Sequence, residues 1–326
     1  TLKPKGASFE LGDTKKIVTG VLSTGLDFGP DGALYAGDWI DGWATGKIGR
    51  IWKFDDKAGA AMPERKQTKE LLAADFSNYA IEKLGALLGN ADMRVRLKAQ
   101  FAMVKAGDKA VPLFKAALAQ KTNQLERVHA IWGISQMARK QQDLAALLLP
   151  YLKDSDDEIR AQVAKWLGDI RYKAAGEALL PLLKDSFSRA RFFAAEALGR
   201  IQYEPGIQPI IAMLRDNNDV DAYLRHAGSL ALARIGKTAP IVALAKDTSR
   251  AVRIAAVVAL RRMSDPGITA FLADADEYVV TEVARAINDD LSIPAALPAL
   301  GDILTTTKFK NEALIRRLVS ANLRVG

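Results

Sequence analysis

The stretch Asp156–Ile170, with the sequence DDEIRAQVAKWLGDI, decides the fold of this chain. It reads as one amphipathic helix, in which the Asp156 side chain accepts a backbone N–H at the N-terminus. Ile159, Val163 and Leu167 recur at every fourth position and form one apolar stripe. The pattern therefore predicts a capped helix with one buried face.

The same pattern recurs along the chain at intervals of 27 to 36 residues, each time around one anchor position. The anchors are Arg96, Arg127, Arg160, Arg191, Arg225, Arg253 and Arg316, and Val280 holds the place once. Capping residues stand four positions before six anchors, namely Asp92, Asn123, Asp156, Asp221, Ser249 and Asp276. Small or β-branched residues follow at three positions beyond each anchor, and large apolar residues at seven. Eight copies with a period near 31 predict a solenoid of helix pairs.

The order Asp-x-x-Val/Ile-Arg, followed by Ala and Leu-Gly, resembles the second helix of HEAT repeats. Two copies carry it clearly, at Asp156–Gly168 and Arg191–Gly199. The period is short for that family and closer to the compact variant found in bilin lyases. The resemblance implies a right-handed α-solenoid of about eight short repeats, in which Asp and Arg pair between adjacent repeats. Arg160 is therefore expected to contact an acidic or carbonyl group of a neighbouring repeat.

The first 57 residues lack helical periodicity and are rich in glycine, which favours short strands. Strands are predicted at Ser8–Leu11, Leu26–Phe28, Ala33–Ala36 and Gly49–Phe54. We therefore divide the chain into a β segment at 1–57, a linker at 58–75 and a HEAT-repeat solenoid at 76–326. Within the solenoid, the first helices of three pairs are expected at Leu113–Ala119, Leu144–Leu152 and Ala178–Leu183. The predicted fold class is mainly α with a small antiparallel β segment.

Residues 25–39, GLDFGPDGALYAGDW, resemble a blade of the propellers of soluble glucose/sorbosone-type quinoprotein dehydrogenases. Residues 127–133, RVHAIWG, and 221–227, DAYLRHA, resemble helices of large bacterial proteins that join such a propeller to HEAT repeats and a c-type cytochrome. The ending at 314–326 resembles the exit before the next module. The chain thus looks like the last propeller blade and the HEAT region of such a multidomain protein.

This resemblance implies a non-catalytic scaffold or protein-interaction module within a periplasmic or secreted enzyme. Pyrroloquinoline quinone, calcium and haem would then be bound by other domains of the parent, and this chain alone is not expected to turn over a sugar or alcohol. The three weak candidates for contact with a cofactor are Asp38, Trp39 and Asp41, which follow the Leu-Tyr strand. No catalytic or metal-binding residue is predicted.

The amino-acid composition excludes several kinds of chemistry and of partner for this chain. The chain has 326 residues and no cysteine, which excludes disulfides, thiolate catalysis and Cys-x-x-Cys-His haem attachment. It starts at Thr1 without a signal-peptide core, so we expect a processed protein or a fragment. No apolar run is long enough to span a membrane. The net charge of +8 is dispersed, apart from one basic cluster at 308–326, so nucleic acid is an unlikely partner.

Two further interpretations stay open at this point. The chain could be an independent HEAT-repeat adaptor or a bilin-lyase-like chaperone, or it could be a HEAT protein that binds nucleic acid. His129 and His226 are the two histidines, and neither belongs to a His-x-x-x-His or His-Glu pair that would bind a metal. The expected partner is another protein or a neighbouring domain of the same parent.

Overall fold

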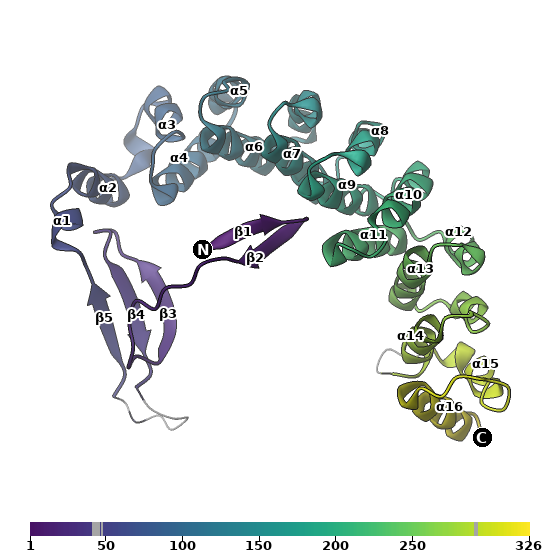
Figure 1. Cartoon of the computed structure of the whole chain (residues 1–326). Coiled ribbons are helices and arrows are strands. Elements are labelled where there is room, and N and C mark those ends of the chain that lie inside the picture. Colours follow the sequence, from purple (N-terminus) through teal and green to yellow (C-terminus); the bar gives the residue numbers. More distant parts are fainter. Residues whose placement is uncertain (41–45, 47, 290–292) are drawn as a thin grey trace. The chain divides into compact units, whose positions relative to one another are not determined.

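The computed structural model describes residues 1–40, 46, 48–289 and 293–326. The chain is mainly α and packs its helices as a HEAT-like solenoid, with small antiparallel sheets at the N-terminal end, which confirms the predicted fold class (Figure 1). It forms two compact units. The first unit comprises residues 1–2 and 11–141, and the second comprises residues 3–10 and 142–326.

Two small sheets hold the strands of the described residues. The strands are β1 (Leu2–Lys5), β2 (Ser8–Leu11), β3 (Ser23–Phe28), β4 (Leu34–Asp38) and β5 (Arg50–Phe54). β1 and β2 form a hairpin, and the other three form an antiparallel sheet in the order β3-β4-β5. The sequence pattern located four of these strands and missed β1, whose Lys-Pro-Lys run carries no apolar alternation.

The three-stranded sheet has one apolar face. Leu26 pairs with Ala36, and Ala36 pairs with Trp52, so these side chains lie on the same face. Leu26 is 63% exposed. Two arginines join the sheet to the helices of the first unit. Arg65 Nε donates to the Asp31 carbonyl at 2.9 Å, and Arg94 Nη1 donates to the carbonyl of Gly29 at 2.7 Å.

The stretch 58–75, which we predicted as a linker, is largely helical. It holds most of α1 (Lys57–Ala60) and all of α2 (Pro63–Ala73), and the 3₁₀ helix η1 (Phe76–Asn78) follows. Pro63 is compatible with this helix. It occupies the first turn of α2, where its fixed φ suits a helix and its missing N–H costs nothing.

Helix pairs follow in both units. In the first unit they are α3 (Ile81–Leu87), α4 (Met93–Ala106), η2 (Gly107–Ala110), α5 (Val111–Ala119) and α6 (Gln124–Ala138). The second unit begins with η3 (Gln142–Lys153), α7 (Asp157–Asp169), η4 (Lys173–Ala175), α8 (Gly176–Leu179), η5 (Leu180–Lys184) and α9 (Ser188–Arg200). It continues with η6 (Glu204–Gly206), α10 (Ile207–Asn217), α11 (Ala222–Ile235), α12 (Thr238–Val242), η7 (Ala243–Lys246), α13 (Arg250–Met263), η8 (Pro266–Phe271), α14 (Glu277–Asn288), η9 (Pro294–Ala296), α15 (Leu297–Asp302) and α16 (Glu312–Val325).

Two of the predicted first helices contain 3₁₀ geometry. Leu144–Leu152 lies within η3, and Ala178–Leu183 spans the end of α8 and most of η5. Each of these segments contains a proline, Pro150 or Pro181. Proline removes an N–H donor and clashes with the carbonyl four residues back, so the tighter 3₁₀ geometry replaces the α-helix.

Small residues let successive second helices pack closely. A Cβ added at Gly168 of α7 would lie 2.6 Å from Ala197 Cα of α9, and one at Gly199 would lie 2.7 Å from Ala231 Cα of α11. The Leu-Gly of the repeat pattern is thus explained by backbone contact between neighbouring repeats. Across the described residues, no helix is both long and apolar enough to cross a membrane.

Candidate binding surface on the second unit

The predicted capping residues stand at the N-termini of second helices. Asp156, for example, accepts from Glu158 N at 2.9 Å and from Ile159 N at 3.2 Å. The residues placed at N-caps in this way are Asp92, Asn123, Asp156, Asp221, Ser249 and Asp276. Each satisfies amide groups that the helix itself leaves without acceptors.

A second row of acceptors, which sequence reasoning missed, stands two residues before the caps. Each side chain accepts the backbone N–H of the cap residue at 2.8 or 2.9 Å. The row consists of Asn90, Asp154, Asp185, Asp247 and Asp274. The regular Asp or Asn at this spacing was a visible signal, because short acidic side chains fold the backbone into such turns.

Arg160 connects its own turn to the next repeat. Its Nη1 donates to the Asp154 carbonyl at 2.8 Å. Its Nε and Nη2 donate to the two carboxylate oxygens of Asp185 at 2.7 and 2.9 Å. Burial alone would raise the pKa of Asp185, but the bonds from Arg160 and from Phe187 N hold that pKa below its usual value. We call this arrangement, with a carbonyl six residues back and a carboxylate of the next repeat, an arginine clamp.

Arg253 forms the same arginine clamp. Its Nη1 donates to the Asp247 carbonyl at 2.9 Å, and its Nε donates to Asp274 Oδ2 at 2.6 Å. Its Nη2 reaches Asp274 Oδ1 at 3.3 Å. A forked pair of charged hydrogen bonds is among the stronger polar contacts in proteins. These two clamps therefore tie successive repeats together at their turns.

Three other anchor arginines bind partners that differ from those of the two arginine clamps. Arg96 Nη1 donates to the Asn90 and Ala91 carbonyls at 2.7 and 2.8 Å, and burial lowers the pKa of Arg96. Arg127 Nε donates to the Leu118 carbonyl at 2.9 Å, and Arg225 Nη1 pairs with Asp219 at 2.6 Å. Anchors of one sequence position thus differ in their contacts.

The last anchor needs a correction. Arg316 is exposed and pairs with Glu312 on its own helix, whereas the next residue, Arg317, binds Asp289 Oδ2 through Nη2 at 2.7 Å. The cap of this helix is Asn311, which lies five residues before Arg316 instead of four. Counted from this cap, the sequence pattern was aligned one residue late, so Leu323, at the position of the large apolar residues, is 80% exposed.

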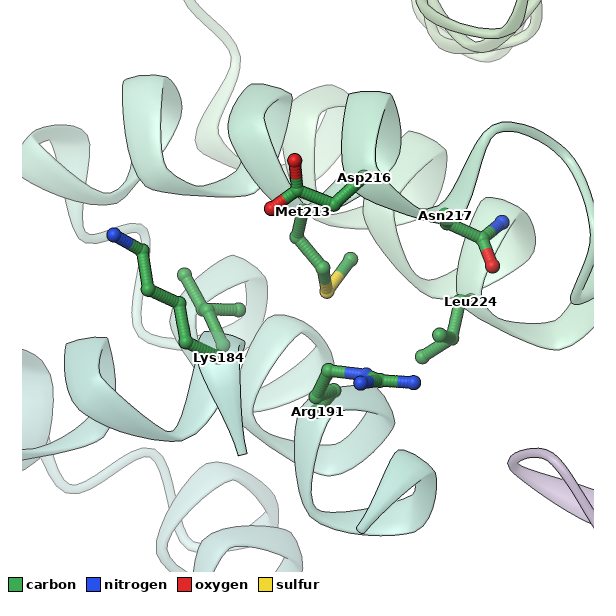
Figure 2. A pocket seen from close by; sticks show the side chains of 7 residues that line it. Lys184, Arg191, Met213, Asp216, Asn217 and Leu224 are labelled. Carbon is green, nitrogen blue, oxygen red and sulfur yellow. The ribbon is translucent and has the colours of Figure 1, made fainter. Parts of the chain in front are cut away.

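Arg191 has the carbonyl contact of an arginine clamp without the carboxylate. Its Nη1 donates to the Asp185 carbonyl at 3.1 Å, and its Nη2 donates to Ser188 Oγ at 2.9 Å. Its Nε is buried, and no acceptor within the described residues lies in hydrogen-bond reach. A cavity of about 300 Å³ opens beside it. Figure 2 shows Met213 over the Arg191 guanidinium and Leu224 beside it.

The loop after α10 explains why a carboxylate is missing there. Asn218 and Asp219 both adopt positive φ, 42° and 63°, so the residue two before the cap turns toward Arg225. Asn217 instead accepts the N–H of the cap residue Asp221 at 3.1 Å. Its amide Nδ2 donates to the Asp221 carbonyl at 3.0 Å. Asn217 therefore takes the cap-binding role that Asp185, Asp247 and Asp274 have in other repeats.

The β1–β2 hairpin is held by the same unit. Ala7 N donates to Asp221 Oδ2 at 2.7 Å. The Arg189 guanidinium lies 5.4 Å from the centre of the Phe9 ring, and Arg189 also pairs with Glu158. A Cβ at Gly6 would come within 2.2 Å of Asp221 Oδ2, and Gly6 has a φ of +56°, so only glycine suits this turn. The helix cap Asp221 thus doubles as an acceptor for another segment.

The weak cofactor candidates lie on the sheet of the first unit. Asp38 is buried and accepts from Trp52 Nε1 at 2.8 Å, Ile40 N at 3.0 Å and Leu22 N at 3.1 Å. The bond from Trp52 is the main reason that the pKa of Asp38 lies below its usual value. Trp39 is 41% exposed, and Asp41 lies outside the described residues. The Asp38 carboxylate therefore supports the local backbone.

The two histidines have different surroundings. His129 is buried, its Nδ1 lies 2.8 Å from Gln100 Oε1, and burial together with the charge of Arg96 lowers its pKa to about 4. His226 is exposed on α11. No cluster of three or more metal-ligating side chains occurs within the described ranges.

The stacked helix pairs and capped turns of the second unit are similar to HEAT repeats. The family described as HEAT repeats matches residues 145–233. No curated protein matches the chain.

Three solved structures show similar folds at low identity. An engineered protein is 19% identical over 74% of this chain and 77% of its own, with a TM-score of 0.40. YibA of Escherichia coli is 16% identical over 80% and 97%, with a TM-score of 0.46. The complex of CpcE and CpcF of phycocyanin lyase from Nostoc is 17% identical over 77% and 97%, with a TM-score of 0.41.

Proposed function

We propose that this chain is a protein-interaction module that holds a peptide segment against the N-terminal ends of α9 and α11. The observation that carries the proposal is the hairpin contact. Asp221 accepts a backbone N–H of the turn, and Arg189 lies over the Phe9 ring. A carboxylate that binds main chain and a cation that binds an aromatic ring are general means of peptide recognition.

The hairpin is a weak occupant of this surface. Its strands are almost wholly exposed, Phe9 is 46% exposed, and a two-stranded hairpin alone is marginally stable in water. A partner that presents a glycine turn followed by an aromatic residue could replace it. The surface would then alternate between the chain's own hairpin and a partner segment.

The test uses a synthetic peptide of residues 1–12 and the full chain. Gly6→Val should eject the hairpin, because a side chain at this position overlaps Asp221. We expect the fluorescent peptide to bind this variant more tightly than it binds the unchanged protein. The matched control is Gly6→Val with Asp221→Asn, which keeps a good helix cap and removes the carboxylate acceptor. Equal binding to all three proteins would refute the proposal.

We further propose that the module belongs to a larger periplasmic or secreted quinoprotein-type dehydrogenase. The motifs at 25–39, 127–133 and 221–227 support this, and so does the apolar face of the β3-β4-β5 sheet, which suits packing against another blade. Pyrroloquinoline quinone, calcium and haem would be bound by other parts of the parent. The intact mass of the natural protein with a haem stain tests this, and a haem-free product of about this length would refute it.

A further inference from the structure

We infer that the cavity beside Arg191 binds the carboxylate of an acidic side chain on a partner peptide. The inference rests on the proposed function only for the source of the carboxylate. The preference of the cavity for a carboxylate follows from two other repeats, in which the equivalent arginine binds a carboxylate.

The donors of Arg191 match those of a complete arginine clamp one by one. Nη1 donates to the carbonyl six residues back in Arg160, Arg191 and Arg253 alike. Nη2 donates to a side chain three residues back in Arg160 and Arg191, Asp157 or Ser188. In Arg160 and Arg253, Nε then donates to a carboxylate oxygen at 2.7 or 2.6 Å. In Arg191, Nε lacks this carboxylate, and Nη2 donates to Ser188 Oγ without the second carboxylate oxygen that it reaches in the two complete clamps.

An unsatisfied Nε–H at a buried atom is costly, so a ligand that accepts it gains affinity. The Nε and Nη2 groups of a guanidinium form a planar fork that fits the two oxygens of a carboxylate. Arg160 shows this fit with Asp185 at 2.7 and 2.9 Å. Arg191 is therefore preorganised for the same group.

The charges around the cavity favour a monoanion. Arg191 and Lys184 line it with Asp216, so two positive side chains face one negative side chain. This balance fits a single carboxylate better than a phosphate dianion. Figure 2 shows the Asp216 carboxylate turned away from Arg191, on the opposite side of Met213 from Asn217 and Leu224.

The remaining lining suits the stem of an acidic side chain. Leu183, Met213 and Leu224 are buried and present apolar surface to the cavity. The methylene groups of a glutamate can pack there while its carboxylate reaches Arg191. The cavity also adjoins the hairpin contact, because Asn217 bonds directly to Asp221. A peptide held by Asp221 could thus place an acidic residue in the cavity.

The experiment follows the Nε–H resonances of arginines in the full chain by two-dimensional ¹H–¹⁵N NMR. The probes are a short peptide with a central glutamate between leucines, its glutamine analogue and sodium acetate, all at one ionic strength set with chloride. Arg191→Lys assigns the resonance. We expect the glutamate peptide to shift Arg191 Nε–H, while Arg160 and Arg253, already paired, stay unchanged.

Two variants test whether the response to the peptide depends on the Arg191 guanidinium. Arg191→Lys keeps the charge but loses the fork, so affinity for the glutamate peptide should fall about tenfold or more. Asn217→Asp supplies a carboxylate in the chain and should abolish the response of Arg191 to the peptide.

Several outcomes would overturn the inference. A shift with chloride alone, or an equal shift with the glutamine peptide, would exclude carboxylate recognition. A shift with acetate but none with the glutamate peptide would exclude a peptide as the source. These results are independent of the hairpin assay, which uses a different peptide and different variants, so failure here would leave the proposed function standing.

Discussion

Arg160 and Arg191 occupy equivalent positions in successive repeats, yet they end in different surroundings. Arg160 meets the carboxylate of Asp185, while Arg191 meets a cavity. Both lie four residues after the N-cap residue of their helix, and both donate Nη1 to the carbonyl six residues back. The difference arises in the following loop, where two left-handed residues move the acidic side chain away. In a solenoid, one altered turn can thus change a structural contact into a place for a ligand.

The largest expected effect is a difference in stability between variants of these two arginines. Arg160→Ala should lower the free energy of unfolding of the second unit by about 3 kcal/mol, because it leaves the Asp185 carboxylate buried and unpaired. Arg191→Ala should cost about 1 kcal/mol, since no carboxylate loses its partner.

Urea unfolding of both variants, followed by circular dichroism, measures the difference. The two units can unfold in separate transitions, so each transition is fitted on its own. Equal losses for the two variants would mean that the arginine clamp does not stabilise the repeat.

Arg96 is a second anchor that binds backbone carbonyls and no carboxylate of the described residues. Its charge acts on His129, so its surroundings can be tested through the pH dependence of stability. Its charge, together with burial, keeps His129 neutral with a pKa of about 4. The unfolded chain binds a proton on this residue below about pH 6.5, and the folded chain does not until about pH 4. Stability of the first unit is therefore full well above pH 6.5 and falls by about 3 kcal/mol as the pH drops to 4.

His129→Gln is the control, because glutamine keeps polarity without titrating in this range. Subtracting its pH profile from that of the unchanged protein removes the contribution of the carboxylates. A difference that stays flat between pH 6.5 and 4 would contradict a neutral His129.

The caps and most anchors could be predicted from the sequence because they depend on spacing within one helix. The expectation that Arg160 contacts the next repeat came from the resemblance to HEAT repeats, and Asp185 lies at that place. The cavity could not be predicted, since it depends on the positive φ values of Asn218 and Asp219. The contact between the hairpin and Asp221 could not be predicted either, because Ala7 and Asp221 are 214 residues apart in the sequence.

Asn217→Asp should place a carboxylate on the lining of the cavity that Arg191 also lines. We expect a gain of about 1 kcal/mol in the second unit, from a charged hydrogen bond to Arg191 minus the lost bond from the Asn217 amide. The gain should vanish when Arg191→Ala is added. A thermal unfolding series of the two single variants and the double variant forms the required cycle. Additive effects would show that the two side chains do not meet.

The smallest expected effect concerns the last repeat, where sequence and structure disagree on the anchor. Arg316 pairs with Glu312 at an exposed position, so Arg316→Ala should change stability by less than about 0.5 kcal/mol. Arg317 is largely buried and binds both oxygens of Asp289 at 2.9 and 2.7 Å, so Arg317→Ala should cost about 1 kcal/mol.

Paired urea unfolding of these two variants decides which residue anchors the repeat. If Arg316→Ala costs more than Arg317→Ala, then the anchor position read from the sequence is the right one, and α16 binds its neighbour through a different face. The comparison of Arg160 with Arg191 does not depend on this result, because both arginines lie four residues after the N-cap residue of their helix.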